Sequence, residues 1–316
     1  MSCPSELSLN LVFNHCYTRA SNLFGLTQSE LSMNPTTLDP QFESYLNDAP
    51  NLTYVQPTDS AWRRLLIDKL EVTLGRKKLE SVYHTLKEAD FDVTSFFTSA
   101  IQASEITINN RGIDPLSLNL KGPLILLANH PFGIIDGVVL CNIAAQLRGD
   151  LRILINSALC QDRDLAPYFL PIDFDNSRRA VKTNIRSKQL ALQCLAEEIP
   201  VLIFPAGMVS TAGKFGLGSV VDAPWTTFAA KLVKEAKATV IPVYFSGQNS
   251  RKFHIASHLA EPLRMGMLMH EALNKFGDQI DVTVGSPIKW DQVAHLQSRQ
   301  ELTKTLYNCV QSLAPK

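Results

Sequence analysis

The feature that most constrains the fold is an alternation, between residues 104 and 290, of short apolar runs with longer segments of helical pattern. Strands that alternate with helices along a chain form a mainly parallel sheet with helices on both faces. We therefore predict an α/β fold with a mixed, mainly parallel sheet flanked by helices. The expected strands are Glu105–Asn109, Leu124–Ala128, Leu151–Ile155, Val201–Phe204, Thr239–Phe245 and Ile280–Val284.

The segments between these runs repeat apolar residues with helical period. The expected helices lie near Ile135–Leu147, Leu165–Phe169, Val181–Glu198, Trp225–Ala236, Phe253–Leu259, Arg264–Phe276 and Asp291–Leu313.

The chain before residue 104 divides into two parts. Residues 1–59 hold one expected helix, about Glu6 to Phe24, followed by an irregular segment rich in Asn, Pro, Thr, Ser and Asp. The pattern of residues 60–103 predicts three helices, with Trp62 and Phe96 in their core, that form an N-terminal helical layer against an α/β domain at 104–316.

Composition limits the compartment and the partners. Hydrophobic residues make up 45% of the chain and charged residues 19%, which is ordinary for a globular protein. The 30 Lys and Arg residues balance the 30 Asp and Glu residues, so the whole chain has no general attraction to nucleic acid. The six cysteines are scattered, no signal peptide is apparent, and no apolar run is long enough to span a bilayer. We expect a cytoplasmic protein with reduced thiols. If its substrate is a lipid, the protein must meet the membrane from outside, as a peripheral protein at the inner face of the cell membrane.

The strongest candidate for chemistry is a histidine that follows a predicted strand. His130 comes two residues after the run Leu124–Ala128, and Asp136 lies six residues further on, at the start of a predicted helix. Sites collect at the carboxyl ends of strands in α/β folds. A neutral imidazole can take a proton from an attacking hydroxyl or amine, and a carboxylate on its other nitrogen fixes the tautomer.

No serine or cysteine nucleophile lies next to this pair, so the natural interpretation is a base that activates the acceptor itself. The alternative interpretation is structural. His130 would cap the strand, and Asp136 would be an acidic residue favoured by the helix dipole.

Four blocks of sequence favour the chemical interpretation. The segment Asn129–Gly137, with the sequence NHPFGIIDG, resembles the first motif of the glycerolipid (lysophospholipid) acyltransferase superfamily, and more closely its bacterial hemolysin-like branch, which includes ornithine-lipid acyltransferases. The blocks Phe204–Ser210, Ile241–Ser250 and Gly285–Ile288 agree with this family in order and distance. The resemblance covers roughly residues 60 to 290.

The resemblance implies transfer of a fatty acyl chain from an acyl-carrier-protein or coenzyme A thioester to a glycerolipid or lysophospholipid hydroxyl, with no metal or other cofactor. It implies His130 as base, Asp136 as its orienting partner, and backbone amides near Gly133 or Gly207 that stabilise the oxyanion. The expected substrate-binding residues are Asn129, Phe132, Gly133, Arg178, Arg179, Pro205, Gly207, Ser210 and Asn249.

Two departures from the family pattern bear on the acceptor and the geometry. Ala206 and Val209 stand where the phosphate-using branch has a glutamate and an arginine, which argues against a phosphate-bearing acceptor. An amine such as ornithine therefore remains an alternative acceptor, and a non-catalytic acyl-binding or lipid-binding protein remains an alternative class. Five residues, rather than the commoner four, separate His130 from Asp136, so the pair can meet only if Pro131 and Gly133 form a turn.

The most one-sided charge run is residues 177–188, which carries five basic residues and no acidic one. Arg178 and Arg179 stand just before a predicted helix and are candidates to hold a phosphate, an acidic carrier protein or anionic lipid. A solvated basic helix face is the alternative. His254 and His258 have helical i, i+4 spacing but no third ligand, so we expect no metal site.

Overall fold

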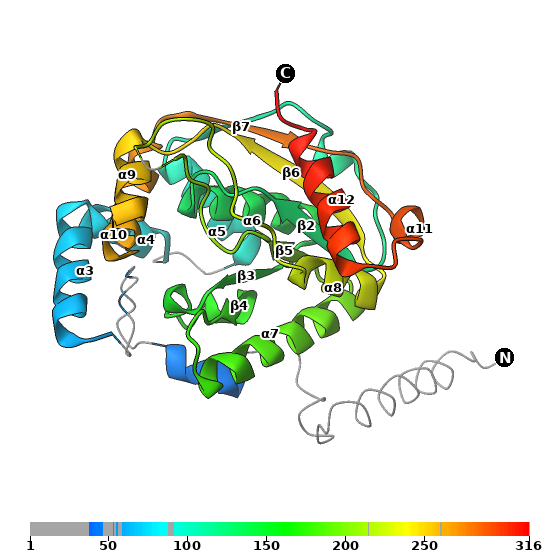
Figure 1. The fold of residues 1–316 in the computed structure, drawn as a ribbon, viewed down its shortest axis with the longest axis horizontal. Coiled ribbons are helices and arrows are strands. Elements are labelled where there is room, and N and C mark those ends of the chain that lie inside the picture. The colour runs from blue at the N-terminus through cyan, green and yellow to red at the C-terminus, as the bar shows by residue number, and fades with distance from the viewer. Residues whose placement is uncertain are drawn as a thin grey trace.

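The computed structural model describes residues 38–46, 53, 55, 59–87, 92–213, 215–259 and 261–315 (Figure 1). The helix expected at Glu6–Phe24 and most of the irregular segment lie outside these residues. Within the described ranges, no helix has the length and apolar character needed to cross a membrane.

One seven-stranded sheet forms the centre of the molecule, in the order β1-β7-β6-β2-β5-β3-β4. Strands β6, β2, β5, β3 and β4 run parallel to one another, whereas β7 is antiparallel to β6 and parallel to β1. The prediction of a mixed, mainly parallel sheet is confirmed. The strands are β1 (Thr107–Asn110), β2 (Leu124–Ala128), β3 (Arg152–Asn156), β4 (Phe169–Ile172), β5 (Val201–Ile203), β6 (Thr239–Ser246) and β7 (Gln279–Val284).

Strand β4 was not expected, and the helix predicted at Leu165–Phe169 is wrong. A single 3-10 turn, η4 (Ala166–Tyr168), is followed directly by the strand. In the sequence, Pro171 argues against a strand, because proline has no backbone N–H to donate to a neighbouring strand. It is tolerated here because β4 is the edge strand and pairs only with β3.

Strand β2 separates two layers of helices. Its five residues are all buried, and alternate side chains point to opposite faces. Leu124 and Leu126 pack in the core that contains α5 (Val93–Ala103) and α6 (Ile134–Arg148). Ile125 and Leu127 face the other core, with α7 (Arg178–Ala196), α8 (Phe228–Ala236) and α12 (Arg299–Gln311).

The C-terminal helix expected from Asp291 to Leu313 is divided into two. The short helix α11 (Trp290–Val293) ends before Ser298, which caps α12 by accepting hydrogen bonds from the backbone of Gln300 and Glu301. The remaining short turns are η1 (Pro40–Tyr45), η2 (Pro115–Ser117) and η3 (Ser157–Leu159).

A further group of helices lies on one side of the sheet and includes α3 (Ala61–Thr73), α4 (Arg76–Lys87), α9 (Arg251–Leu259) and α10 (Glu261–Asn274) (Figure 1). The three N-terminal helices contact one another in chain order, α3 with α4 and α4 with α5, while α5 also packs on α6 and α3 on α10. Gly266 allows this close approach, since a Cβ there would lie 3.0 Å from the Cβ of Leu70. Phe96 is a core residue as expected, but the expectation for Trp62 is wrong: its side chain is 68% exposed, on the outer side of α3.

Candidate active site

The carboxyl end of β2 is fixed to β6 by one side chain. Asn129 Nδ2 donates to the carbonyl oxygen of Phe245 at 2.9 Å, and Asn129 Oδ1 accepts from the amide of Phe245 at 2.7 Å. The Asn129 side chain is buried. The sequence predicted that Asn129 binds substrate; the structure shows it joining two strand ends immediately before His130.

A glycine turn connects this strand end to α6. Gly133 is the N-cap of α6 and has φ 86°, ψ −109°, a conformation that residues with a Cβ rarely adopt. A Cβ at this position would lie 3.0 Å from Leu268 Cδ2 and 3.2 Å from Val209 Cγ2. The turn brings Asp136, in the first turn of the helix, back to the strand end, as the six-residue spacing requires.

His130 and Asp136 are in direct contact. The distance from His130 Nδ1 to Asp136 Oδ2 is 3.0 Å, and the same oxygen accepts hydrogen bonds from the backbone amides of Phe132 at 2.8 Å and Gly133 at 3.0 Å. Because these donors hold Oδ2 as an acceptor, Nδ1 carries the ring proton and the lone pair lies on Nε2. His130 Nε2 makes no hydrogen bond to any residue that the structure describes.

The Asp136 carboxyl group is fully buried. Burial raises its pKa above the ordinary value, while the His130 ring and the two backbone amides act in the opposite direction. Its second oxygen, Oδ1, is buried without a partner among the described residues. The hydrogen bonds that the structure gives this buried carboxyl group are all made by Oδ2, the oxygen that contacts the histidine ring.

The His130 ring also packs against the block that follows β5. It stacks on Phe204, with ring centroids 4.0 Å apart and an angle of 22° between the planes. The backbone amide of Ser210 donates to the carbonyl oxygen of His130 at 2.8 Å. The first and second sequence blocks therefore form one site, with 18% of the His130 side chain still exposed.

Sequence reasoning missed Asp222. Its Oδ1 accepts hydrogen bonds from the hydroxyl of Ser210 and, at 3.3 Å, from the backbone amide of His130. Its Oδ2 accepts from Trp225 Nε1 at 2.8 Å. Asp222 belongs to no block with a recognisable spacing. It reaches the site because Thr211 and Val221 form an antiparallel bridge that turns the chain back on itself.

Backbone amides near Gly133 or Gly207 were expected to stabilise the oxyanion, and the amides of these two glycines themselves are already engaged. The amide of Gly133 donates to Asp136, and the amide of Gly207 donates to the carbonyl oxygen of Phe204 at 3.0 Å. Both groups stabilise the turns themselves.

The other predicted binding residues are distributed around the pair. Phe132 is buried, and its ring packs where Gly247 lacks a Cβ. Asn249 is buried and donates to the carbonyl oxygen of Phe132 at 3.5 Å, with its own Oδ1 unpartnered among the described residues. Pro205 is buried and accepts from the amide of Thr226 at 3.1 Å. Gly207 is exposed in the same loop.

The basic run at 177–188 is not one continuous solvated face. Arg186 is buried and paired with Asp39 at 2.7 Å, and Lys188 pairs with Glu235 at 2.7 Å. Arg179 lies 3.6 Å from Asp173 and over the ring of Tyr45. Arg178 is exposed at the start of α7, apart from these pairs.

The two histidines of α9 share one backbone partner. His254 Nδ1 accepts from the amide of Ala212 at 3.3 Å, and His258 Nε2 lies 2.8 Å from the carbonyl oxygen of Ala212. Burial lowers the pKa of His254. Their i, i+4 spacing therefore positions the loop after Ser210. Within the described ranges, no group of histidine, cysteine and acidic side chains is arranged to hold a metal.

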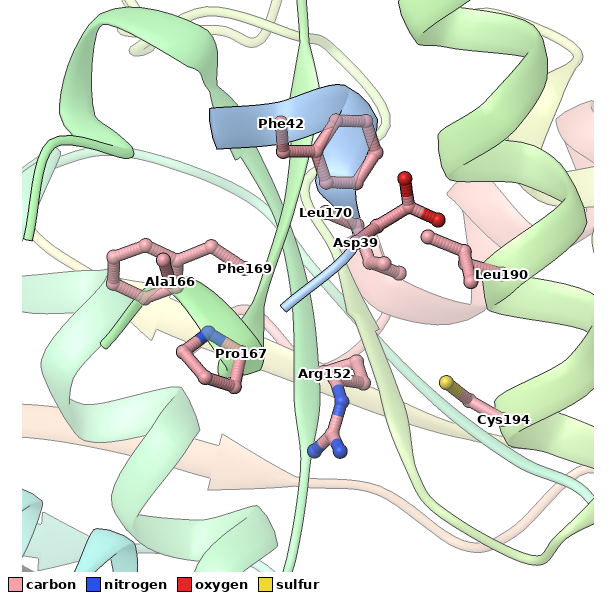
Figure 2. Close-up of a pocket in the computed structure, with 9 residues that line it drawn as sticks. All are labelled: Asp39, Phe42, Arg152, Ala166, Pro167, Phe169, Leu170, Leu190 and Cys194. Carbon is pink, nitrogen blue, oxygen red and sulfur yellow. The ribbon is translucent and has the colours of Figure 1, made fainter. Parts of the chain in front are cut away.

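A small pocket lies away from this site, toward the amino ends of β3 and β4 (Figure 2). Arg152 is the first residue of β3, and its Nη1 lies 2.5 Å from Asp150 Oδ1. His130 lies at the opposite, carboxyl end of the parallel strands. The pocket is lined by Asp39, Phe42, Arg152, Ala166, Pro167, Phe169, Leu170, Leu190 and Cys194.

Comparisons with known proteins show what the chain is similar to. Two lyso-glycine lipid O-acyltransferases, from Phocaeicola vulgatus and Bacteroides thetaiotaomicron, are each 28% identical to the chain; the matches cover 62% of it and 69% and 71% of those proteins. A solved structure, the 1-acyl-sn-glycerophosphate acyltransferase PlsC from Thermotoga maritima, is 15% identical, with a TM-score of 0.45 and coverage of 80% of this chain and 87% of that one. A family model described as Acyltransferase matches residues 61–308. The chain therefore belongs to this acyltransferase family and is itself an acyltransferase.

Proposed function

We propose that the protein transfers a fatty acyl chain from a thioester, on acyl carrier protein or coenzyme A, to the hydroxyl group of a lyso-lipid whose head group is an amino acid rather than a phosphate ester. The observation that carries the proposal is the contact between His130 Nδ1 and Asp136 Oδ2, which directs Nε2 away from the carboxylate.

The chemistry needs one base and one orienting carboxylate. His130 Nε2 removes the proton from the acceptor hydroxyl as its oxygen attacks the thioester carbon. Asp136 stabilises the imidazolium that forms. When the tetrahedral intermediate collapses, the carbon–sulfur bond breaks, and the imidazolium returns the proton to the thiolate. The products are an ester and a free thiol.

Direct attack by the acceptor fits the side chains around His130. The Ser210 hydroxyl is bonded to Asp222 and is buried. Burial raises the pKa of the Cys141 and Cys160 thiols, and that of Cys194 to about 12. None of these groups is placed or ionised as a nucleophile, so no acyl-enzyme step is proposed.

The head group is inferred from the second block and from the relatives. Ala206 and Val209 are both buried, and Val209 packs in an apolar cluster with Leu268 and Phe253. Neither position offers the charged side chain that would hold a phosphate. The relatives named as lyso-glycine lipid O-acyltransferases support an acceptor whose head group is an amino acid.

A transfer assay tests this proposal. Purified protein would receive labelled acyl-carrier-protein or coenzyme A thioesters with lyso-glycine lipid, lyso-ornithine lipid, lysophosphatidate or free ornithine, and mass spectrometry would identify the products. We expect ester formation on the amino-acid lyso-lipids. The His130→Ala and His130→Gln variants should lose about 10²–10⁴-fold in rate, the usual contribution of a general base.

Four results would contradict the proposal. Full activity in His130→Ala, with folding confirmed by circular dichroism, would remove the mechanism. Preferential transfer to lysophosphatidate would remove the acceptor class, and amide formation on free ornithine would favour N-acylation. Binding of labelled acyl chains without transfer to any acceptor would indicate a non-catalytic role.

A further inference from the structure

The first two turns of α7 present apolar and basic side chains on one outward face. Arg178, Val181, Lys182 and Ile185 are separated by three, four and seven residues and therefore share a helix face. Val181 and Ile185 are 55% and 54% exposed, and Phe174, just before the helix, is 59% exposed. These five residues are called the α7 surface below.

The α7 surface adjoins the catalytic edge of the sheet. Strand β4 ends at Ile172 and α7 begins at Arg178, so Phe174 lies beyond the carboxyl end of a strand parallel to β2. Two atoms of the Phe174 ring lie 3.5 and 3.6 Å from the position that a Cβ on Gly207 would occupy. Gly207 belongs to the block Phe204–Ser210, in which the Ser210 amide donates to the carbonyl oxygen of His130, so this surface lies next to the site.

Other exposed apolar side chains follow strands that end at the same edge of the sheet. Large apolar residues cluster on exposed surfaces where a protein meets a partner or a membrane. Two further segments that begin at the carboxyl ends of strands, the loop after β5 and helix α9 after β6, carry exposed large apolar residues. They are Met208, Phe215, Leu217, Val221, Ile255 and Leu259.

The charge of the α7 surface is positive. Arg178 and Lys182 are exposed and form no ion pair with any residue that the structure describes. The adjacent acid, Asp175, is also exposed, and its Oδ1 accepts from the amide of Asn176. Because the whole chain has equal numbers of basic and acidic residues, this positive charge is a local property.

We propose that the α7 surface docks the catalytic edge onto an anionic lipid bilayer. The proposal rests on the proposed function, because a lyso-lipid with a long acyl chain resides in the bilayer and the enzyme must meet it there. Phe174, Val181 and Ile185 enter the interfacial region of the bilayer, while Arg178 and Lys182 contact lipid head groups.

A bilayer fits these observations better than an acidic carrier protein does. The exposed apolar residues come from three separate segments that follow β4, β5 and β6. A continuous lipid surface can contact all three segments together, with the two cations adding electrostatic attraction to the apolar contacts.

Vesicle flotation with the full-length chain tests the proposal. Phosphatidylcholine vesicles with and without phosphatidylglycerol would be compared for the wild type, Lys182→Gln, Arg178→Gln/Lys182→Gln and Val181→Ser/Ile185→Ser. We expect preferential binding to the anionic vesicles. Each neutralised cation should weaken that binding by about fivefold, the usual contribution of one basic residue near an anionic surface.

Matched substitutions elsewhere control for general effects. Leu116→Ser removes an exposed apolar side chain from η2, and Lys304→Gln removes an exposed cation from α12. Both should bind vesicles like the wild type. All altered positions are exposed, so the thermal unfolding midpoint should stay unchanged throughout.

Several outcomes would overturn the proposal. Unchanged vesicle binding in every α7 variant would do so, as would loss of binding only on Trp62→Ser, which would assign the contact to α3. If the variants lost affinity for acyl carrier protein but not for vesicles, the surface would be a carrier-protein site.

Vesicle binding that depends on the α7 surface, without acyl transfer to any acceptor, would refute the proposed function and leave the docking surface intact.

Discussion

Among single residues, Gly133 connects the fold to the site most directly. Its backbone amide donates a hydrogen bond to Asp136, and its backbone has φ 86°. The space that a Cβ would occupy is filled by Leu268 and Val209. The turn that pairs His130 with Asp136 therefore depends on the absence of a Cβ.

Gly133→Ala should destabilise the protein by about 1–3 kcal/mol, the usual cost of a residue held in a sparsely populated backbone region. It should also reduce acyl transfer, because any relaxation of the turn moves the Asp136 carboxylate relative to the ring. Urea unfolding and the transfer assay measure the two effects.

Gly137→Ala, in the same helix, is the matched control. Nothing lies within 4 Å of a Cβ there, and Gly137 is not among the glycines with positive φ. Alanine should be neutral or stabilise the helix by up to about 1 kcal/mol. Equal effects at the two glycines would refute the role assigned to Gly133.

Of the residues named from sequence, His130 and Asp136 were predicted together because spacing and strand-end position are local properties. The structural role of Asn129 was not predicted, because Phe245, to which its side chain is hydrogen-bonded, lies 116 residues away in the chain. Likewise, the hydrogen bond from the Ser210 hydroxyl to Asp222 depends on how a loop folds back, and a single sequence contains no periodic signal for that.

Between elements, an ion-pair cluster ties α4 to the loop before β4. Lys87 Nζ lies 2.6 Å from Asp162 Oδ2 and 2.6 Å from Asp164 Oδ2. Burial of Asp162 favours its neutral form, but the bonds from Lys87 and from the backbone amides of Asp164 and Leu165 outweigh burial and lower its pKa. This cluster holds one of the outer helices on the sheet.

Lys87→Met should destabilise the protein by about 1.5–3 kcal/mol near neutral pH, the usual contribution of hydrogen bonds to a charged group. The Asp162 pKa is lowered in the folded state, so its contribution is present above the ordinary aspartate value and is lost as pH falls through the folded-state value. The difference between wild type and variant should therefore shrink in acid.

Urea unfolding from pH 7 down to the acid limit of folding measures this difference. Lys78→Met removes an exposed lysine from the same helix and should have little effect at any pH. A difference for Lys87→Met that stayed constant into acid would show that packing of the lysine stem, rather than its charge, links the two elements.

Element type was predictable from sequence wherever burial produced a regular pattern. Strands β2 and β7 were found because their apolar residues form clear runs or alternations. Strand β4 was missed because Pro167 and Pro171 interrupt the pattern, and its place at the sheet edge is a property of the assembled sheet. The side of α3 that packs was also misjudged, since its partner α10 lies about 200 residues later in the chain.

Across the whole molecule, the site is assembled from chain segments that the sheet brings to one edge. The first block follows β2 and the second follows β5, its neighbour in the sheet. Asp222 joins them by accepting from the Ser210 hydroxyl and the His130 amide, and it is held in turn by Trp225. Removing it should loosen the two blocks from each other.

Asp222→Ala should lower the transfer rate more than it raises KM, because it leaves the His130 side chain intact but frees the backbone that positions it. It also leaves the buried Ser210 hydroxyl without its acceptor, at a cost of about 1–3 kcal/mol in unfolding free energy. Asp222→Asn keeps one acceptor oxygen and should recover part of the rate.

Two partner variants separate the links that Asp222 makes. Ser210→Ala should reproduce much of the kinetic loss, whereas Trp225→Phe removes only the indole donor, keeps an aromatic ring near Tyr307, and should stay close to the wild type. A double-mutant cycle between Asp222→Ala and Ser210→Ala should then show strong non-additivity in kcat. Additive losses would mean that the two residues act independently, and that the edge is held together by packing of Phe204 on His130 instead.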